Sequence, residues 1–172
     1  MSGAASWSFR EEDASRIGAL LDRLLAESSA RTALLVDRAG QMLATAGQPP
    51  RFDPITFATL TAADFSANDQ LARLLGENEF GALFHQGEKD SLYLADVARR
   101  VILVVLFDNS TTLGLVKLRV RGIVGELSRV FLEMFAREGA GERGRPGAGV
   151  ERGFVGEAED EIDRLFGTSG RG

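Results

Sequence analysis

Two stretches of the chain carry apolar residues at three- and four-residue spacing, which is the pattern of amphipathic helices. The first covers residues 9–28, and Glu11, Glu12 and Asp13 near its start suit the positive end of a helix dipole. The last runs from about Leu113 to Arg137. The apolar positions of the first helix are Ile17, Leu20, Leu21, Leu24 and Leu25.

A third helix is predicted between them, from Pro54 to about Leu75. Asp53 is a good capping residue, proline suits the first helical position, and Gly76 suits the C-terminal cap. Its middle, residues 61–67, is rich in small side chains. Its apolar positions are Ile55, Leu60, Leu71, Leu74 and Leu75.

Shorter apolar or alternating runs predict five strands. The runs are joined by short turns, such as the one at Gly40, where glycine can take positive φ. Short connections favour antiparallel pairing. The strands are predicted at residues 32–37, 41–46, 80–86, 91–97 and 101–107. The order α-ββ-α-βββ-α with a five-stranded antiparallel sheet is an α/β sandwich of the α+β class.

The two ends of the chain differ from this pattern. Residues 1–8 are predicted to be disordered, residues 9–137 to form the domain, and residues 138–153 to form a glycine-rich flexible linker. Residues 154–172 form an acidic tail that contains five carboxylates together with the apolar residues Ile162, Leu165 and Phe166. Their spacing favours a short docking helix, and the alternative is a disordered solubilising tail.

Composition narrows the class of partner. With 44% hydrophobic residues the chain can bury a core, and its formal net charge of −5 argues against a nucleic-acid partner. The absence of cysteine excludes disulfides and thiolate metal sites and fits a cytoplasmic location. The N-terminus does not resemble a signal peptide. The apolar run at 101–107 is far shorter than the roughly 20 residues of a membrane span, so no integral membrane segment is predicted.

No constellation in the sequence predicts catalysis. The single histidine, His85, has no nearby set of metal ligands and no nucleophile, so a structural role is expected. The glycines of residues 139–149 lack the lysine of a phosphate-binding loop. We therefore predict no catalytic residues, no metal site and no cofactor, and expect a function carried by a surface.

Several motifs together resemble the Roadblock / dynein light chain superfamily, and more closely its MglB-like branch. They are LVDRAGQ at 35–41, LTA at 60–62, LARLLGENEF at 71–80, FHQGEKDSLY at 84–93, VVLFDNSTTLGLVKLR at 104–119 and EDEIDRLF at 159–166. The resemblance covers roughly residues 10–137 and the tail.

The resemblance implies a regulator of a Ras-like small GTPase (MglA-like) in bacterial cell polarity and motility, enriched at a cell pole. Members of this branch are homodimers that pair edge strands and place their two middle helices side by side. They activate GTP hydrolysis by remodelling the GTPase, without an arginine finger, and have no active site of their own. The tail is implicated in nucleotide exchange.

Mapped onto this chain, the resemblance implies a GTPase platform on the small-residue helix. The platform residues are Ala62, Ala63, Ser66, Ala67, Gln70 and Arg73, the dimer edge is Phe84, His85 and Gln86, and the tail docks through Ile162, Leu165 and Phe166.

Three other interpretations remain open at this point. A non-activating homodimeric scaffold is one, because Ser66 and Gln70 are larger than the residues expected at those positions. A small-molecule sensor with a similar sheet is another. The third is an arginine finger supplied in trans by Arg73, Arg100, Arg119 or Arg121, although such charged side chains are usually solvated.

Overall fold

The computed structural model describes residues 7–143 and has the predicted order of elements. The helices are α1 (Glu11–Ser28), α2 (Pro54–Leu74) and α3 (Leu113–Arg143). The strands are β1 (Thr32–Asp37), β2 (Met42–Gly47), β3 (Ala82–Gln86), β4 (Asp90–Val97) and β5 (Val101–Asp108). The prediction of an α+β fold with five strands is confirmed.

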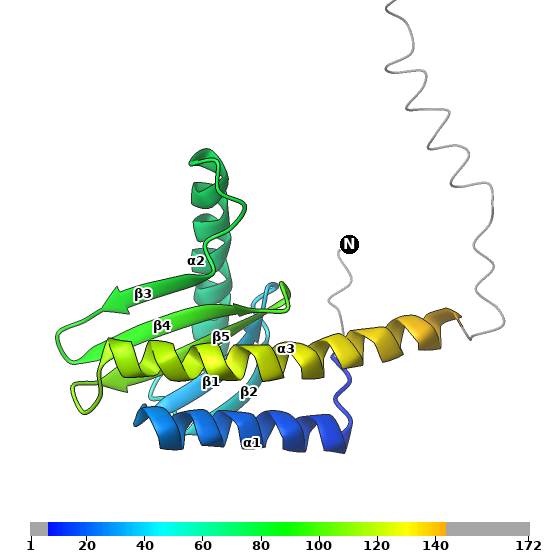
Figure 1. The fold of residues 1–172 in the computed structure, drawn as a ribbon, viewed down its shortest axis with the longest axis horizontal. Coiled ribbons are helices and arrows are strands. Elements are labelled where there is room, and N and C mark those ends of the chain that lie inside the picture. The colour runs from blue at the N-terminus through cyan, green and yellow to red at the C-terminus, as the bar shows by residue number, and fades with distance from the viewer. Residues whose placement is uncertain (1–6, 144–172) are drawn as a thin grey trace, which may run out of the picture. The chain divides into compact units, whose positions relative to one another are not determined.

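The five strands form one antiparallel sheet in the order β2-β1-β5-β4-β3. Helices α1 and α3 cover one face and α2 lies on the other (Figure 1). Strand β1 is buried along its whole length, as expected for a central strand covered on both faces. Strands β2 and β3 are the two edges, so within residues 7–143 each has one row of backbone groups without a strand partner.

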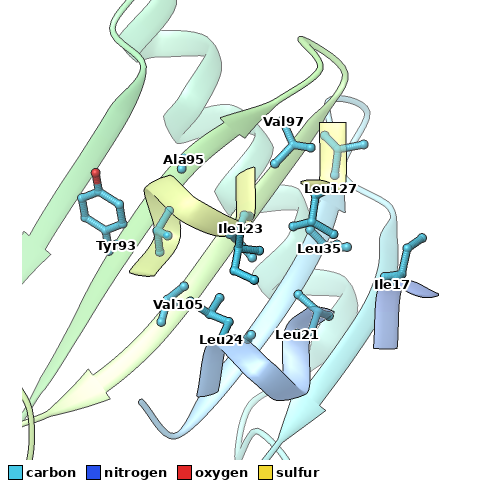
Figure 2. Close-up of a cluster of buried hydrophobic side chains, with 14 of the residues drawn as sticks. Ile17, Leu21, Leu24, Leu35, Tyr93, Ala95, Val97, Val105, Ile123 and Leu127 are labelled. Carbon is cyan, nitrogen blue, oxygen red and sulfur yellow. The ribbon is translucent and has the colours of Figure 1, made fainter. Parts of the chain in front are cut away.

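Side chains alternate between two hydrophobic clusters, one on each face of the sheet. The larger cluster joins α1 and α3 to the sheet and includes Leu21, Leu35, Val105 and Leu127 (Figure 2). The smaller cluster lies under α2, which contributes only Ala58 and Phe65 to its buried residues. Helix α2 is therefore held by much less buried apolar surface than the other two helices.

The β1–β2 turn fixes the position of α2. Gly40 has a φ of +91°, as its place in the turn predicts, and an added Cβ would lie 3.1 Å from the Thr59 Cα. The Asp37 carboxylate accepts hydrogen bonds from the Ala39 and Gln41 amides across the turn. A side chain at position 40 would push the helix away from the sheet.

The chain ends depart from the predicted boundaries. Residues 7 and 8 were expected to be disordered, but the Trp7 indole donates a 2.7 Å hydrogen bond to Asp37 and packs edge-on against Phe131. Burial of the indole beside α3 outweighs the small, polar character of the surrounding sequence. Helix α1 begins at Glu11 rather than Phe9, and Phe9 instead stacks on Trp7.

Helix α3 continues to Arg143, past the predicted end at Arg137 and into the first residues of the expected linker. Glycines 139 and 141 weaken a helix without ending it, since each costs about 1 kcal/mol relative to alanine. The rest of the linker lies outside the described residues. Over the range 7–143, no helix is long and apolar enough to span a membrane.

Candidate interaction surface on helix α2 and strand β3

Helix α2 packs on the sheet through small side chains rather than through its leucines. The residues it buries are Ala58, Thr61, Ala62, Phe65, Asn68 and Ala72. The apolar residues that mark this helix in the sequence face solvent: Ile55, Leu60, Leu71, Leu74 and Leu75 are all exposed. The small side chains let the helix approach the sheet closely, while Phe65 fills the space beneath it.

Three exposed leucines and an exposed alanine form a stripe along α2 that we call the apolar ridge: Leu60, Ala67, Leu71 and Leu74. Leu60, Ala67 and Leu74 are seven residues apart, which is about two helical turns, so they lie nearly in line. Leu60 is 63% exposed and Leu74 is 82% exposed. A contiguous apolar stripe at this spacing is typical of a helix that packs against another helix.

The apolar ridge borders the side of α2 that faces the β3 edge. The His85 Nε2 on β3 and the Asp64 Oδ2 on α2 lie 2.6 Å apart and form a hydrogen bond, which fixes that side. Phe84 on the other face of β3 stacks on Phe107, with ring centroids 6.2 Å apart. Gln86 is exposed at the end of the strand. The residues predicted for the dimer edge thus lie on an open edge strand next to the ridge.

The predicted platform residues occupy the next stripes around the helix. Ala63 and Gln70 form one pair seven residues apart, and Ser66 and Arg73 form the next; all four are at least partly exposed. Ala67 is exposed on the ridge. Ala62 is 7% exposed and packs toward the sheet, so little of its surface is available to a partner. Contact of these residues with a GTPase stays a prediction.

The far side of α2 is tied to the sheet by Arg38 of the β1–β2 turn. Its guanidinium donates a 2.7 Å hydrogen bond to Asp69 of α2 and also bonds to Asp96 of β4. The same group lies 4.4 Å from the centroid of the Phe65 ring. The Arg38 Nε is buried and has no hydrogen-bond partner in the described part of the chain. Arg38 and His85 therefore anchor opposite flanks of α2.

A polar pocket of about 350 Å³ lies beside this flank. Its lining includes Ser66 and Arg73 of the predicted platform, together with Arg99 from the β4–β5 turn. The remaining lining residues are Arg38, Ala62, Asp69, Asn78 and Glu79. The pocket lies between the predicted platform on α2 and the turns that carry Arg38 and Arg99.

An open groove of about 550 Å³ lies on the other face of the sheet, between β3, β4 and the first turns of α3. Its floor includes Phe84 and Tyr93, and Lys117 and Arg121 are the cations that line it. Burial raises the pKa of the Tyr93 phenol, and the positive charge of Arg121 partly opposes that change. The groove is an open surface feature rather than an enclosed ligand cavity.

The other sequence candidates are not brought together. Arg100 stacks on Phe135 at 4.3 Å from the ring centroid, and Arg119 lies 3.5 Å from Glu27, so both are engaged within the protein. Arg121 lines the groove on the opposite face from α2. Among residues 7–143 there is no group of three or more histidine, aspartate and glutamate residues that could hold a metal ion. Ile162, Leu165 and Phe166 lie outside the described residues.

A protein-family model for the Roadblock/LC7 domain matches residues 16–107, more than half of the chain. The chain belongs to the Roadblock/LC7 family. No match was found among curated proteins.

Solved structures place the chain in the MglB-like branch of this family. MglB from Myxococcus xanthus is 46% identical, and the match covers 69% of this chain and 97% of that one with a TM-score of 0.67. The gliding protein MglB from Thermus thermophilus is 35% identical, with 76% and 98% of the two chains covered and a TM-score of 0.71. A structure described as MglB with a tetrameric arrangement is also 35% identical, with the same coverage and a TM-score of 0.72.

Two residues that orient α2 were not predictable from the sequence. Arg38 and Asp64 contribute through contacts with distant parts of the chain, and no local pattern identifies them. The outward direction of the ridge had a signal, because Leu60, Ala67 and Leu74 share a seven-residue spacing. A second signal was the run of small residues at 58, 62 and 72, which marks the side that approaches the sheet.

Proposed function

We propose that the chain is a homodimeric regulator that accelerates GTP hydrolysis by a Ras-like GTPase of the MglA type. The observation that carries the proposal is an exposed helix face beside an open sheet edge, in a chain 46% identical to Myxococcus MglB. The regulator has no active site of its own, acts in the cytoplasm at a cell pole, and serves cell polarity and motility.

The homodimer is proposed to form through β3 and the apolar ridge. No other described strand pairs with the outer side of β3, and pairing with a second copy would extend the sheet across the two protomers. The leucines of the ridge lie on the same side of α2 as this edge, since Asp64 bonds to His85. Strand pairing and helix packing thus supply one continuous interface that removes exposed apolar surface from water.

The GTPase is proposed to dock on the stripes that the dimer leaves free, which carry Ala63, Ser66, Gln70 and Arg73. Small and uncharged side chains at the centre of this surface allow a close approach of the partner backbone. Activation without an arginine finger requires that binding favours the catalytically competent arrangement of the GTPase. The size of the acceleration then depends on how much more tightly the dimer binds the competent arrangement than the inactive one.

Single-turnover GTP hydrolysis tests the proposal, with the dimer in excess over an MglA-type GTPase. We expect a faster rate with the wild-type chain and no acceleration with the double variant Ala63→Arg, Ser66→Arg, because two large cations block the surface. Leu118→Arg is the matched control, since Leu118 is also exposed but lies on α3. A variant that ends at residue 153 tests the contribution of the tail, with the rate of nucleotide exchange as the readout.

A GTP hydrolysis rate that is the same with the wild-type chain as with the GTPase alone contradicts the proposed activity. If calorimetry then detects binding, the chain is a non-activating scaffold instead. The exposed position of Gln70 on the platform favours this second candidate, because its side chain can hold a partner back from the helix.

A further inference from the structure

The β4–β5 turn adopts a backbone conformation that its residues disfavour. Arg100 donates a backbone hydrogen bond of 3.3 Å to Val97, so Ala98 and Arg99 are the two central residues of the turn. Both have positive φ, +53° for Ala98 and +60° for Arg99. Asparagine and glycine are the residues that suit such a turn. Strain of this kind in non-glycine residues is a common feature of functional sites.

The strained turn presents Arg99 to solvent. Its side chain is 80% exposed, and its only ion pair among the described residues is a long contact of 3.8 Å to Glu79. The Asp96 carboxylate accepts a 3.0 Å hydrogen bond from the Arg99 amide, which holds the backbone of the turn in place. The position of Arg99 is thus defined by the turn, while its guanidinium remains available to a partner.

A second arginine without a close carboxylate partner among residues 7–143 lines the same polar pocket as Arg99. Arg73, on the last turn of α2, also lines this pocket, and among residues 7–143 no carboxylate lies within ion-pair distance of it. The charge of Arg38 is already compensated, because it bonds to both Asp69 and Asp96. Two arginines of the lining, Arg73 and Arg99, are thus the cations at this pocket whose charge is not closely compensated by a carboxylate among residues 7–143.

We propose that Arg73 and Arg99 bind a carboxylate side chain on the surface of the GTPase that docks on α2. This inference rests on the proposed function and adds to it the chemistry of one contact. An arginine guanidinium binds a carboxylate with two parallel hydrogen bonds, which defines orientation as well as affinity. The contact therefore selects a partner with an acidic residue opposite this flank of α2.

Calorimetry of the full chain with an MglA-type GTPase, loaded with a non-hydrolysable GTP analogue, tests the contact. We expect Arg99→Glu and Arg73→Glu each to lower the affinity by about tenfold or more, since each places a carboxylate opposite a carboxylate. Raising the salt concentration weakens wild-type binding more than binding by either variant. Arg121→Glu makes the same charge change in the groove on the opposite face and should leave the affinity unchanged.

Two substitutions in the turn separate the arginine from the strain. Ala98→Asn relieves the backbone and keeps Arg99, so the melting temperature should rise while the affinity stays the same. Arg99→Gly relieves the backbone and removes the guanidinium, so the melting temperature should rise while the affinity falls. A purely structural role of the turn predicts instead that affinity follows stability in both variants.

The possible results separate the carboxylate contact from the proposed function. Wild-type binding that is unaffected by Arg99→Glu and Arg73→Glu overturns the carboxylate contact and leaves the proposed function standing. Variants that bind normally but lose all acceleration assign the arginines to the bound nucleotide, which also overturns it. If the wild-type chain does not bind the GTPase, the proposed function and the contact fail together.

Discussion

At the scale of single residues, Asp53 determines where α2 begins. Its carboxylate accepts a 2.6 Å hydrogen bond from the Thr56 hydroxyl and a 2.8 Å bond from the Thr56 amide. These bonds lower the pKa of Asp53 below its ordinary value of 3.8. The stabilisation from this ionised cap is therefore complete above that pH and is lost as the pH falls through the lower pKa of the folded state.

Substitution of Asp53 tests this cap. We expect Asp53→Ala to lower the urea midpoint of unfolding at pH 7, and the difference from wild type to shrink as the pH falls below 3.8. Asp53→Asn is the control, because it keeps an acceptor for the Thr56 amide and has no titrating group. A difference between wild type and Asp53→Ala that is constant from pH 7 down to pH 3 would contradict the interpretation.

For single residues, the sequence predicts features that depend on near neighbours but does not predict long-range contacts. The cap at Asp53 and the turn at Gly40 were predictable, because each depends on a few neighbouring residues. The bond between His85 and Asp64 was not, since the two residues meet only after the chain has folded. A local pattern records propensity, whereas a long-range contact depends on the packing of whole elements.

At the scale of elements, α2 combines a weakly apolar packing face with a strongly apolar exposed face. In an isolated protomer this arrangement leaves the leucines in water, at an unfavourable free energy of about 25 cal/mol per Å² of apolar surface. Burial of the ridge in a homodimer removes that cost. The direction of α2 is thus explained by the proposed assembly rather than by the protomer alone.

Substitutions in the ridge test this explanation. We expect Leu71→Asp and Leu74→Asp each to shift the chain from dimer to monomer in sedimentation equilibrium, because a charge in an apolar interface must be desolvated. Leu118→Asp is the matched control, since Leu118 is 60% exposed on α3 and lies outside the proposed interface. Dimers that persist in both ridge variants would place the interface elsewhere.

The element boundaries could be predicted closely where strong stop signals occur. Pro54 starts α2, and the helix ends before Gly76, as the sequence indicates. The end of α3 was harder to predict, because glycines at 139 and 141 reduce helix propensity without removing a backbone donor as proline does. The burial of Trp7 was missed for a similar reason, since its partners Asp37 and Phe131 are remote in sequence.

At the scale of the whole molecule, the sheet separates two cores of unequal size. The cluster under α1 and α3 contains most of the buried hydrophobic residues, and the cluster under α2 is much smaller. The fold class and the antiparallel sheet followed from the alternation of helical and strand patterns. The inequality of the two cores did not, because it depends on which face of α2 meets the sheet.

This inequality has a consequence for local unfolding. An element with little buried apolar surface opens at a lower free energy than the rest of the fold, so its amide hydrogens exchange sooner. We expect the α2 amides of the monomer to exchange faster than those of β5 and of residues 113–135 of α3, as measured by mass spectrometry. Protection of α2 equal to that of β5 would contradict this order.

Binding of a second copy or of a GTPase to α2 should then slow exchange there more than elsewhere, because ligands stabilise the closed state by mass action. The amide exchange rates of α2 would therefore show whether a partner is bound to this helix. They would also measure the free energy that each partner contributes.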